Sequence, residues 1–407
     1  MGGKELYEVL LGLKKPWEVQ DVKVEAKEKK VEVLVGYKEG TIWGDGEGRR
    51  LPTHDHVEKR WRHLDSCGFE TVIRCRVPRV QGPEGNVWTI PVPWSQPGSR
   101  YTVAFESFAI AVMLASKGVA AAAGLLGLGW DAVHGIMERA VERGLVKRDL
   151  EGLRYLGLDE KSFKHDSKFV SVMYDLKGSR VLEVLEGKDE LTGRMLLETL
   201  PDEALDAIAA TAMDMSLSYE AAVKAIIPKS DIVHDRYHIS ANLNEAVDQV
   251  RRSENKAKVE EGDQTLKGTR QLWLCSPANH SKEEQAEFAV LQKQHLKISR
   301  AWAIKEAFVA FWNCADEQSG RAFFKQWYGW AIRSRLAPIK RVARTFKARL
   351  ENIVSYFRHR ITNAVAEGLN SKIQSLTSAA RGFRNFFNYR TRILFFCGKL
   401  DLATCEP

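Results

Sequence analysis

Three acidic residues, Asp159, Asp214 and Glu367, are placed where their carboxylates could act together on one phosphate group. Asp159 and Asp214 each follow a short run of mainly apolar residues, which predicts that each stands at the end of a β-strand. Glu367 lies in a stretch with helical spacing that Asn363 could cap, and it shares a helix face with Asn370. Three carboxylates at one point would repel each other unless cations held them.

The chemistry that requires such a set is two-metal phosphoryl transfer. Paired ions about 4 Å apart stabilise the attacking and the leaving oxygen in that reaction. Hard oxygen ligands favour Mg²⁺ or Mn²⁺ over zinc. The chain has 53 acidic residues, so a single aspartate after an apolar run is usually a solvated strand end. The hypothesis therefore depends on the order of the three acids within a fold.

The predicted elements from residue 153 to residue 234 form one pattern. Strands at 153–158, 168–176 and 180–186 are expected to make an antiparallel meander, followed by a helix over 190–200. A strand leading to Asp214, a helix over 218–227 and a strand over 231–234 complete the set. Acids after the first and fourth strands of such a series are typical of a ribonuclease H-like core. The helix of Glu367 would be its displaced last helix, and the fold class is α+β, with several domains.

Several short runs occur in order along most of the chain and resemble one known family. They are Gly157–Ser162, Met213–Met215, Asp235–His238, Leu266–Arg270, Tyr356–His359, Glu367–Lys372, Arg381–Arg384 and Phe396–Gly398. By these runs the sequence resembles the DDE transposases of the bacterial ISL3 insertion sequences. The resemblance implies that Asp159, Asp214 and Glu367 are the metal-binding DDE residues and that an all-helical insertion follows Asp235. It also implies a role for Asp235 and His238, which match an Asp-x-x-His element of related transposases.

The histidines beside Asp235 allow more than one interpretation. His234 and Asp235 could form a metal-binding pair of the phosphohydrolase kind, but such pairs lie on helices, whereas Ile232 and Val233 predict a strand. His238 could take a direct part in catalysis, or it could order the edge of the site by hydrogen bonding alone.

Basic residues are concentrated in segments that could contact DNA phosphates. The chain has a net charge of +8 and a pI near 9.0, a modest overall bias. Segment 331–350 holds seven basic residues and no acid beside a helical apolar stripe, and basic and aromatic residues alternate between 371 and 400. Alternatively, the aromatics are core residues and the cations a solvated rim. The predicted DNA contacts are Lys267, Arg270, Arg333, Arg335, Lys340, Arg341, Arg344, Lys372, Arg381 and Arg384.

The amino-terminal third has the pattern of a DNA-recognition module. Alternating residues at 21–26 and 30–35 predict a β-hairpin. Helical patterns between 102 and 145, joined by a glycine-bearing turn, suit a helix-turn-helix whose second helix enters the major groove. A plain helical hairpin is the alternative. On the second helix the residues expected to face outward are His134, Arg139 and Arg143.

No zinc is expected in the ribbon-like module. Members of the resembled family usually carry a zinc ribbon with two pairs of closely spaced ligands, and such thiolate pairs hold a tetrahedral zinc. The matching stretches here, 42–47 and 81–86, contain no cysteine, and Cys67 and Cys75 lie outside the ligand set. Without a metal, a small ribbon would have little else to fold it.

These patterns divide the chain into five predicted parts. They are a β-rich ribbon-like module over 1–100, a helix-turn-helix domain over 101–150, the first part of the core over 151–238, the helical insertion over 239–360, and the last part of the core with a basic tail over 361–407. The six cysteines include no Cys-x-x-Cys pair, and no apolar stretch is long enough to span a bilayer. Both features favour a cytoplasmic protein that joins the nucleoid when it binds DNA.

The predicted function is a DNA transposase. It would bind the terminal inverted repeats of its own element, cut with a bound divalent metal, and join the freed ends to double-stranded target DNA. Because two ends must be paired, a homo-oligomer is expected. The alternative, suggested by the missing zinc ligands, is a transposase-derived protein that binds DNA but no longer cuts it.

Overall fold

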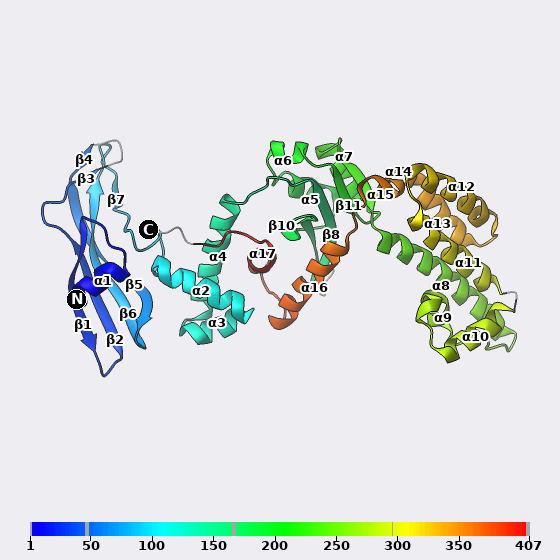
Figure 1. The fold of residues 1–407 in the computed structure, drawn as a ribbon, viewed down its shortest axis with the longest axis horizontal. Coiled ribbons are helices and arrows are strands. Elements are labelled where there is room, and N and C mark those ends of the chain that lie inside the picture. The colour runs from blue at the N-terminus through cyan, green and yellow to red at the C-terminus, as the bar shows by residue number, and fades with distance from the viewer. Residues whose placement is uncertain (1, 45–48, 165–167, 295, 404–407) are drawn as a thin grey trace. The chain divides into compact units, whose positions relative to one another are not determined.

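The computed structural model describes residues 2–44, 49–164, 168–294 and 296–403, which form two compact units (Figure 1). As far as it is described, one unit comprises 2–148 with 400–403, and the other comprises 149–399. Residues 400–403, which were predicted to be part of the segment 361–407 with the last part of the core and the basic tail, thus belong to the first unit. Helices and strands occur in both units, so the chain is of mixed α and β class.

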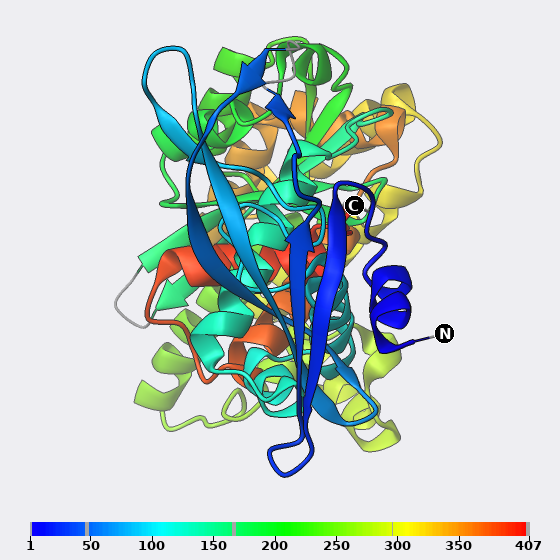
Figure 2. The same cartoon turned by 90° about the vertical axis from the view of Figure 1, so that its left-hand side faces the viewer.

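The first unit contains the β-rich module, whose sheet faces the viewer in Figure 2. The predicted hairpin is confirmed, because its two strands pair antiparallel with Val24 opposite Val31. The sheet has the order β1-β2-β6-β5, with β7 paired to β6, while β3 and β4 form a separate pair. The elements are α1 (Gly3–Leu10), β1 (Trp17–Glu25), β2 (Lys30–Tyr37), β3 (Trp43–Gly44), β4 (Arg50–Leu51), β5 (Thr53–Ser66), β6 (Phe69–Gln81) and β7 (Val87–Thr89).

Tryptophans fill the core of this module. Trp17, Trp43, Trp61 and Trp94 are buried, and the ring centroids of Trp17 and Trp94 are 5.1 Å apart in an edge-to-face contact. Cys75 is buried in the same core, where desolvation raises the pKa of its thiol to about 12. The expectation that the module has little besides zinc to fold it is therefore wrong, because its aromatic core buries extensive apolar surface.

Two stretches, 81–86 and 42–47, were expected to match the zinc-ligand pairs of the family. The first is described completely and the second only in part. Residues 81–86 lead from β6 into β7 through a turn in which the Gly82 amide donates to the Asn86 carbonyl. Part of 42–47 lies outside the described residues.

Three helices complete the first unit: α2 (Val103–Ser116), α3 (Val119–Leu126) and α4 (Trp130–Val146). Gly127 follows α3 with a φ of +63°, a left-handed conformation that lets the chain turn into α4. No single helix in the described ranges is long and apolar enough to cross a membrane; α3 and α4 reach that length and composition only together, bent by 112°.

The residues of α4 that were expected to face outward do not do so. His134 is buried and stacks on Trp130, with ring centroids 4.7 Å apart. Arg139 and Arg143 both form ion pairs with Glu106 of α2, whose side chain is 2% exposed. The prediction is wrong because a buried carboxylate requires cationic partners, and these two arginines supply them.

The second unit is built on a five-stranded sheet with the order β10-β9-β8-β11-β12. The predicted meander is present as β8 (Tyr155–Lys164), β9 (Lys168–Asp175) and β10 (Arg180–Glu186), all antiparallel. Strands β11 (Ala210–Met213) and β12 (Asp231–His234) continue it in parallel. The predicted end of the first strand is wrong, because the pairing of β8 with β9 continues to Lys164, so Asp159 lies within the strand.

Alternate residues of β8 face two different helical layers. Leu156 and Leu158 pack in a core with Leu196 of α5 (Glu190–Leu197) and Tyr219 of α7 (Leu217–Ile226), and the short α6 (Asp202–Asp206) precedes β11. On the opposite face lie α16 (Ala364–Ala379), which contacts Asp159, and α17 (Phe386–Cys397), which packs against β10 (Figure 1). The sheet is therefore the middle layer of three.

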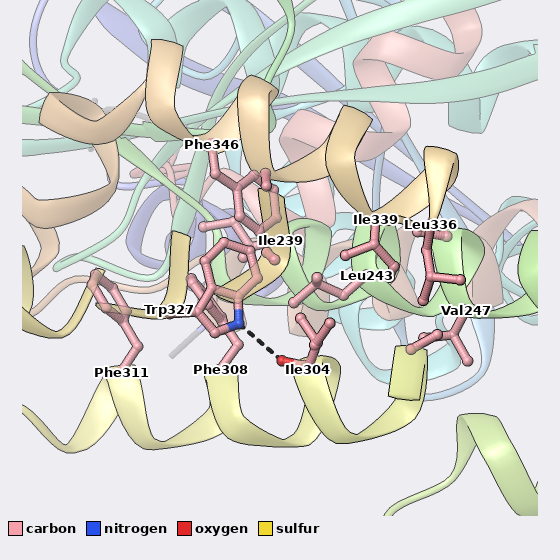
Figure 3. Close-up of a cluster of buried hydrophobic side chains, with 14 of the residues drawn as sticks. Ile239, Leu243, Val247, Ile304, Phe308, Phe311, Trp327, Leu336, Ile339 and Phe346 are labelled. Carbon is pink, nitrogen blue, oxygen red and sulfur yellow. Dashed lines mark hydrogen bonds between the residues drawn. The ribbon is translucent and has the colours of Figure 1, made fainter. Parts of the chain in front are cut away.

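Between β12 and α16 the described residues form helices and their connections. A shared apolar core holds them together, in which Trp327 donates its indole N–H to the Ile304 carbonyl at 2.9 Å (Figure 3). The apolar stripe predicted within 331–350 is confirmed by the buried side chains of Leu336, Ile339, Ala343 and Phe346. The helices are α8 (Arg236–Glu260), α9 (Arg270–Leu274), α10 (Lys282–Gln292), α11 (Lys297–Val309), α12 (Glu317–Arg333), α13 (Ala337–Ala348), α14 (Leu350–Val354) and α15 (Tyr356–His359).

Candidate active site

The parallel pairing of β8 with β11 sets Asp214 beside Asp159. Ala212 lies opposite Gly157 in the register of the two strands, so two further residues bring Asp214 level with Asp159. Neighbouring strands are about 4.8 Å apart, and side chains at one level point to the same face. Asp214 directly follows β11, as predicted, and its Oδ1 accepts a hydrogen bond from the Ser216 amide at 2.9 Å.

Helix α16 brings Glu367 to the same face of β8. At the start of the helix, Oδ1 of Asn363 is 3.2 Å from the position that a Cβ on Gly157 would take. Two turns later, Nδ2 of Asn370 donates to Oδ2 of Asp159 at 2.6 Å. Glu367 is four residues after Asn363 and three before Asn370, so all three lie on one face of the helix. This face, with Glu367 between its two contacts, lies along the strand of Asp159.

Asn370 is a site residue whose role sequence reasoning missed. Its Oδ1 accepts a hydrogen bond from the Tyr174 hydroxyl at 2.7 Å, and its backbone carbonyl accepts one from Nζ of Lys161 at 2.9 Å. Its side chain and backbone therefore join α16 to both β8 and β9. The available signal was its spacing of three residues from Glu367. Asn363, in contrast, precedes α16 as predicted, but its side chain makes no capping hydrogen bond.

The surroundings of Asp159 set its charge. Burial is the main cause of its pKa being raised, and the nearby Asp214 charge raises it further. Hydrogen bonds from Asn370 and from the Glu160 amide, together with the charge of His238, act in the opposite direction. A partly desolvated carboxylate beside a second acid is a place where a cation would relieve repulsion, so the donor chemistry fits a hard divalent ion.

Glu367, the third acid, does not lie in a cluster of metal-binding side chains in the described part of the chain. Glu367 is exposed. Within the described ranges, no three His, Cys, Asp or Glu side chains are gathered closely enough to hold a metal ion. The structure thus brings Asp159 and Asp214 together and places the helix face of Glu367 next to them, with its carboxylate open to solvent.

Asp235 and His238 lie next to the third parallel strand. Because Met213 pairs with His234, Asp235 follows β12 at the level of Asp214. Asp235 is 5% exposed, and its Oδ2 has no hydrogen-bond partner in the described part of the chain. His238, on the first turn of α8, lines a cavity of about 220 Å³ with Asp214, Met215, Asn242, Thr345 and Arg349. The cavity lies where the sheet meets the helical segment.

Both ring nitrogens of His234 have hydrogen-bond partners. Its Nδ1 donates to the Asp214 carbonyl at 3.1 Å, and its Nε2 faces the amide nitrogen of Asn352 at 3.4 Å. Burial lowers the pKa of His234 to about 4, so its ring is neutral at pH 7. Because both ring nitrogens already have partners, the structure does not support the rival hypothesis of a metal-binding pair with Asp235.

A buried ion pair joins the helical segment to the helices of the sheet. Arg349, between α13 and α14, donates from Nε to Oε1 of Glu220 on α7 at 2.8 Å. Their side chains are 17% and 9% exposed. Arg349 belongs to the basic segment 331–350, but its charge is used inside the molecule rather than left for DNA.

Most of the predicted DNA contacts are on the surface of the second unit. Arg270 is 3.6 Å from Asp248, Lys372 donates to the Phe396 carbonyl, and Lys340 is half-buried. In the tail, Arg390 pairs with Glu183 and the buried Arg392 stacks on a phenylalanine, so these two cations do not form a rim. The exposed members of the predicted set are Lys267, Arg270, Arg333, Arg335, Arg341, Arg344, Lys372, Arg381 and Arg384.

Comparison with known families defines the class of protein. Residues 156–393 match a family described as a transposase, the DDE family of ISL3, and residues 90–141 match the helix-turn-helix domain of transposase family ISL3. The chain belongs to the ISL3 family of transposases.

Curated relatives agree with this assignment. The transposase for insertion sequence element IS1001 of Bordetella parapertussis is 26% identical over 288 residues, which cover 70% of this chain and 71% of the relative. The transposase for IS1557 of Mycobacterium tuberculosis is 24% identical over 416 residues, covering 95% and 93%. The prediction of a DNA transposase with a helix-turn-helix domain is confirmed, and the DNA-binding relic is not favoured.

Proposed function

We propose that this transposase cuts and joins DNA with Asp159, Asp214 and Glu367 as its DDE residues. The observation that carries the proposal is the meeting of three elements: β11 sets Asp214 level with Asp159, and α16 contacts Asp159 one turn from Glu367. The strand order supports a ribonuclease H-like core. We assign 239–360 as the insertion in that core, because the described residues there are helical.

The proposed chemistry is metal-dependent hydrolysis followed by strand transfer. DDE transposases generally use a divalent metal, here proposed as Mg²⁺ or Mn²⁺, and such an ion supplies charge stabilisation at the phosphoryl group when bound. Asp159 and Asp214 would hold the ions, with Glu367 as the third ligand. Water is the first nucleophile and a DNA 3′-hydroxyl the second, so no covalent protein intermediate forms.

Other residues near the acids would orient the site. The Glu160 and Ser216 amides fix the carboxylates of Asp159 and Asp214 by donating to them. His238 lines the cavity beside Asp214, a position that supports either direct contact with DNA or ordering of the site edge. Asp235 is buried at the start of α8, which favours a positioning role over contact with the reacting atoms.

End recognition is assigned to the first unit. Its helix-turn-helix domain would bind the terminal inverted repeats, and its β-rich module would assist without zinc. Pairing of two ends implies a homo-oligomer. Action on chromosomal DNA would place the protein at the nucleoid within the cytoplasm.

A cleavage assay with the purified full chain tests the proposal. The substrate is a duplex that carries an end of the protein's own element with its flank, incubated with Mg²⁺ or with EDTA. Strand cleavage that leaves a 3′-hydroxyl is expected with Mg²⁺ and not with EDTA. Binding of the duplex without cleavage in Mg²⁺ or Mn²⁺ would instead support the relic.

The exposed cations of α13 give a separate prediction about DNA affinity. Arg341→Ala and Arg344→Ala should each weaken binding of any duplex, because each removes a phosphate contact. Each substitution should reduce the slope of log K against log salt concentration by about 0.9. Fluorescence anisotropy at several salt concentrations measures this slope. Lys229→Ala is the control, since Lys229 is also exposed but lies 3.3 Å from Asp206 and is outside the predicted set; an equal change there would refute the assignment.

A further inference from the structure

We propose that Asn370 is a positioning residue of the cleavage site, which fixes the Asp159 carboxylate and aligns the helix face of Glu367 with it. The inference rests on the proposed function, because it gives Asn370 a role only through the two proposed metal ligands. Asn370 itself would touch neither the metal nor the DNA.

Two hydrogen bonds fix the orientation of the Asn370 side chain, one donated to an acceptor and one accepted from a donor. A carboxylate only accepts, so the amide NH₂ must face Asp159, at 2.6 Å. The Tyr174 hydroxyl then donates to the amide oxygen at 2.7 Å, and Tyr174 is fully buried in β9. An aspartate at position 370 would set carboxylate against carboxylate, and an apolar residue would satisfy neither partner. Asparagine matches both.

These contacts leave Asp159 able to bind a ligand. Its Oδ1 accepts from the Glu160 amide at 2.8 Å and its Oδ2 accepts from Asn370. Each carboxylate oxygen can accept about two hydrogen bonds or ligand bonds, so each retains capacity for a cation. Hydrogen bonds to ligating carboxylates orient them, and loss of such a partner typically costs about 10- to 100-fold in metal affinity or activity.

The docking of α16 does not depend on this amide alone. Ala366, Ile373 and Leu376 of the helix are buried, and Lys161 donates to the backbone carbonyl of Asn370, which a substitution preserves. The structure therefore separates the two roles. Removing the side chain should free the Asp159 carboxylate while leaving α16 in place.

The full chain with Asn370→Ala tests the inference, with Gln374→Ala as the matched control one turn further along the same helix face. Mn²⁺ affinity is measured by titration calorimetry without DNA, and cleavage of the repeat-end duplex is measured against Mg²⁺ concentration. Asn370→Ala should weaken Mn²⁺ binding by about 10-fold and raise the Mg²⁺ midpoint by a similar factor. Its DNA affinity and melting temperature should stay near those of Gln374→Ala.

Two outcomes would overturn the inference: unchanged Mn²⁺ affinity and Mg²⁺ midpoint in Asn370→Ala, or an equal loss in Gln374→Ala. If Asn370→Ala does not fold, Tyr174→Phe decides, because it removes only the hydroxyl that holds the amide and should give a smaller loss in the same direction; no loss would count against the inference. Asp159→Ala separates this result from the proposed function. If Asp159→Ala still binds Mn²⁺ and cuts, the proposed function itself fails.

Discussion

Replacing Glu367 by Gln should reduce DNA cleavage by about 10³-fold or more, while binding of the repeat-end duplex stays within a few-fold of wild type. The substitution keeps the size of the side chain and removes its charge. Glu367 is exposed, so the fold does not depend on that charge. The helix face of Glu367 lies against β8 through Asn363 and Asn370. The substitution therefore removes a negative charge next to the proposed metal ligand Asp159.

The measurement is single-turnover cleavage in Mg²⁺, with duplex binding by anisotropy and thermal unfolding run on the same preparations. Asp159→Asn should give a comparable loss, and Gln374→Ala is the control on the same helix. Cleavage by Glu367→Gln at close to the wild-type rate would refute its assignment as the third acid. The cleavage core would then have to rest on Asp159, Asp214 and another donor.

The second large effect concerns stability. Arg349→Met should lower the free energy of unfolding of the second unit by about 3–5 kcal/mol, because it leaves Glu220 buried without its main cationic partner. The pair connects α7 to the junction of α13 and α14, so its loss also weakens the contact between the sheet and the helical segment.

Denaturant unfolding followed by intrinsic fluorescence measures this effect. Arg344→Met, which removes an exposed cation of the preceding helix α13, is the control and should change stability by less than about 0.5 kcal/mol. In the double variant with Glu220→Gln, the loss should be smaller than the sum of the two single losses. Equal stability of Arg349→Met and Arg344→Met would show that the ion pair contributes little.

The sequence was most informative where local pattern decides structure. The alternation of residues at 21–26 and 30–35 predicted the hairpin of β1 and β2, and the meander of β8 to β10 followed from the same kind of signal. The stripe on α13 was also predictable, because residues three and four apart must share a helix face. Asp214 was located correctly after its strand, because a short apolar run predicts a buried strand.

Other features depended on distant partners that no local pattern contains. Arg139 and Arg143 were expected to face DNA, but Glu106, more than 30 residues earlier, draws both inward. Arg349 belongs to a basic segment in sequence, but its charge is paired with Glu220, which lies 129 residues earlier. Asn370 was predicted to share a helix face with Glu367. Its hydrogen bond to Asp159, however, joins residues that are 211 positions apart. The sequence pattern predicts which side chains share one face of a helix or strand, but it does not predict which other element packs against that face.

The placement of α16 and α17 over one face of the sheet has a consequence for how the protein is made. Both aspartates and their strands leave the ribosome early, whereas the layer that carries Glu367 emerges only after the whole helical segment has been synthesised. A nascent or prematurely terminated polypeptide that stops before α16 would carry the DNA-recognition helices and two of the three acids. Such a fragment could occupy an element's ends without breaking them, and would act as a competitor of the full-length enzyme.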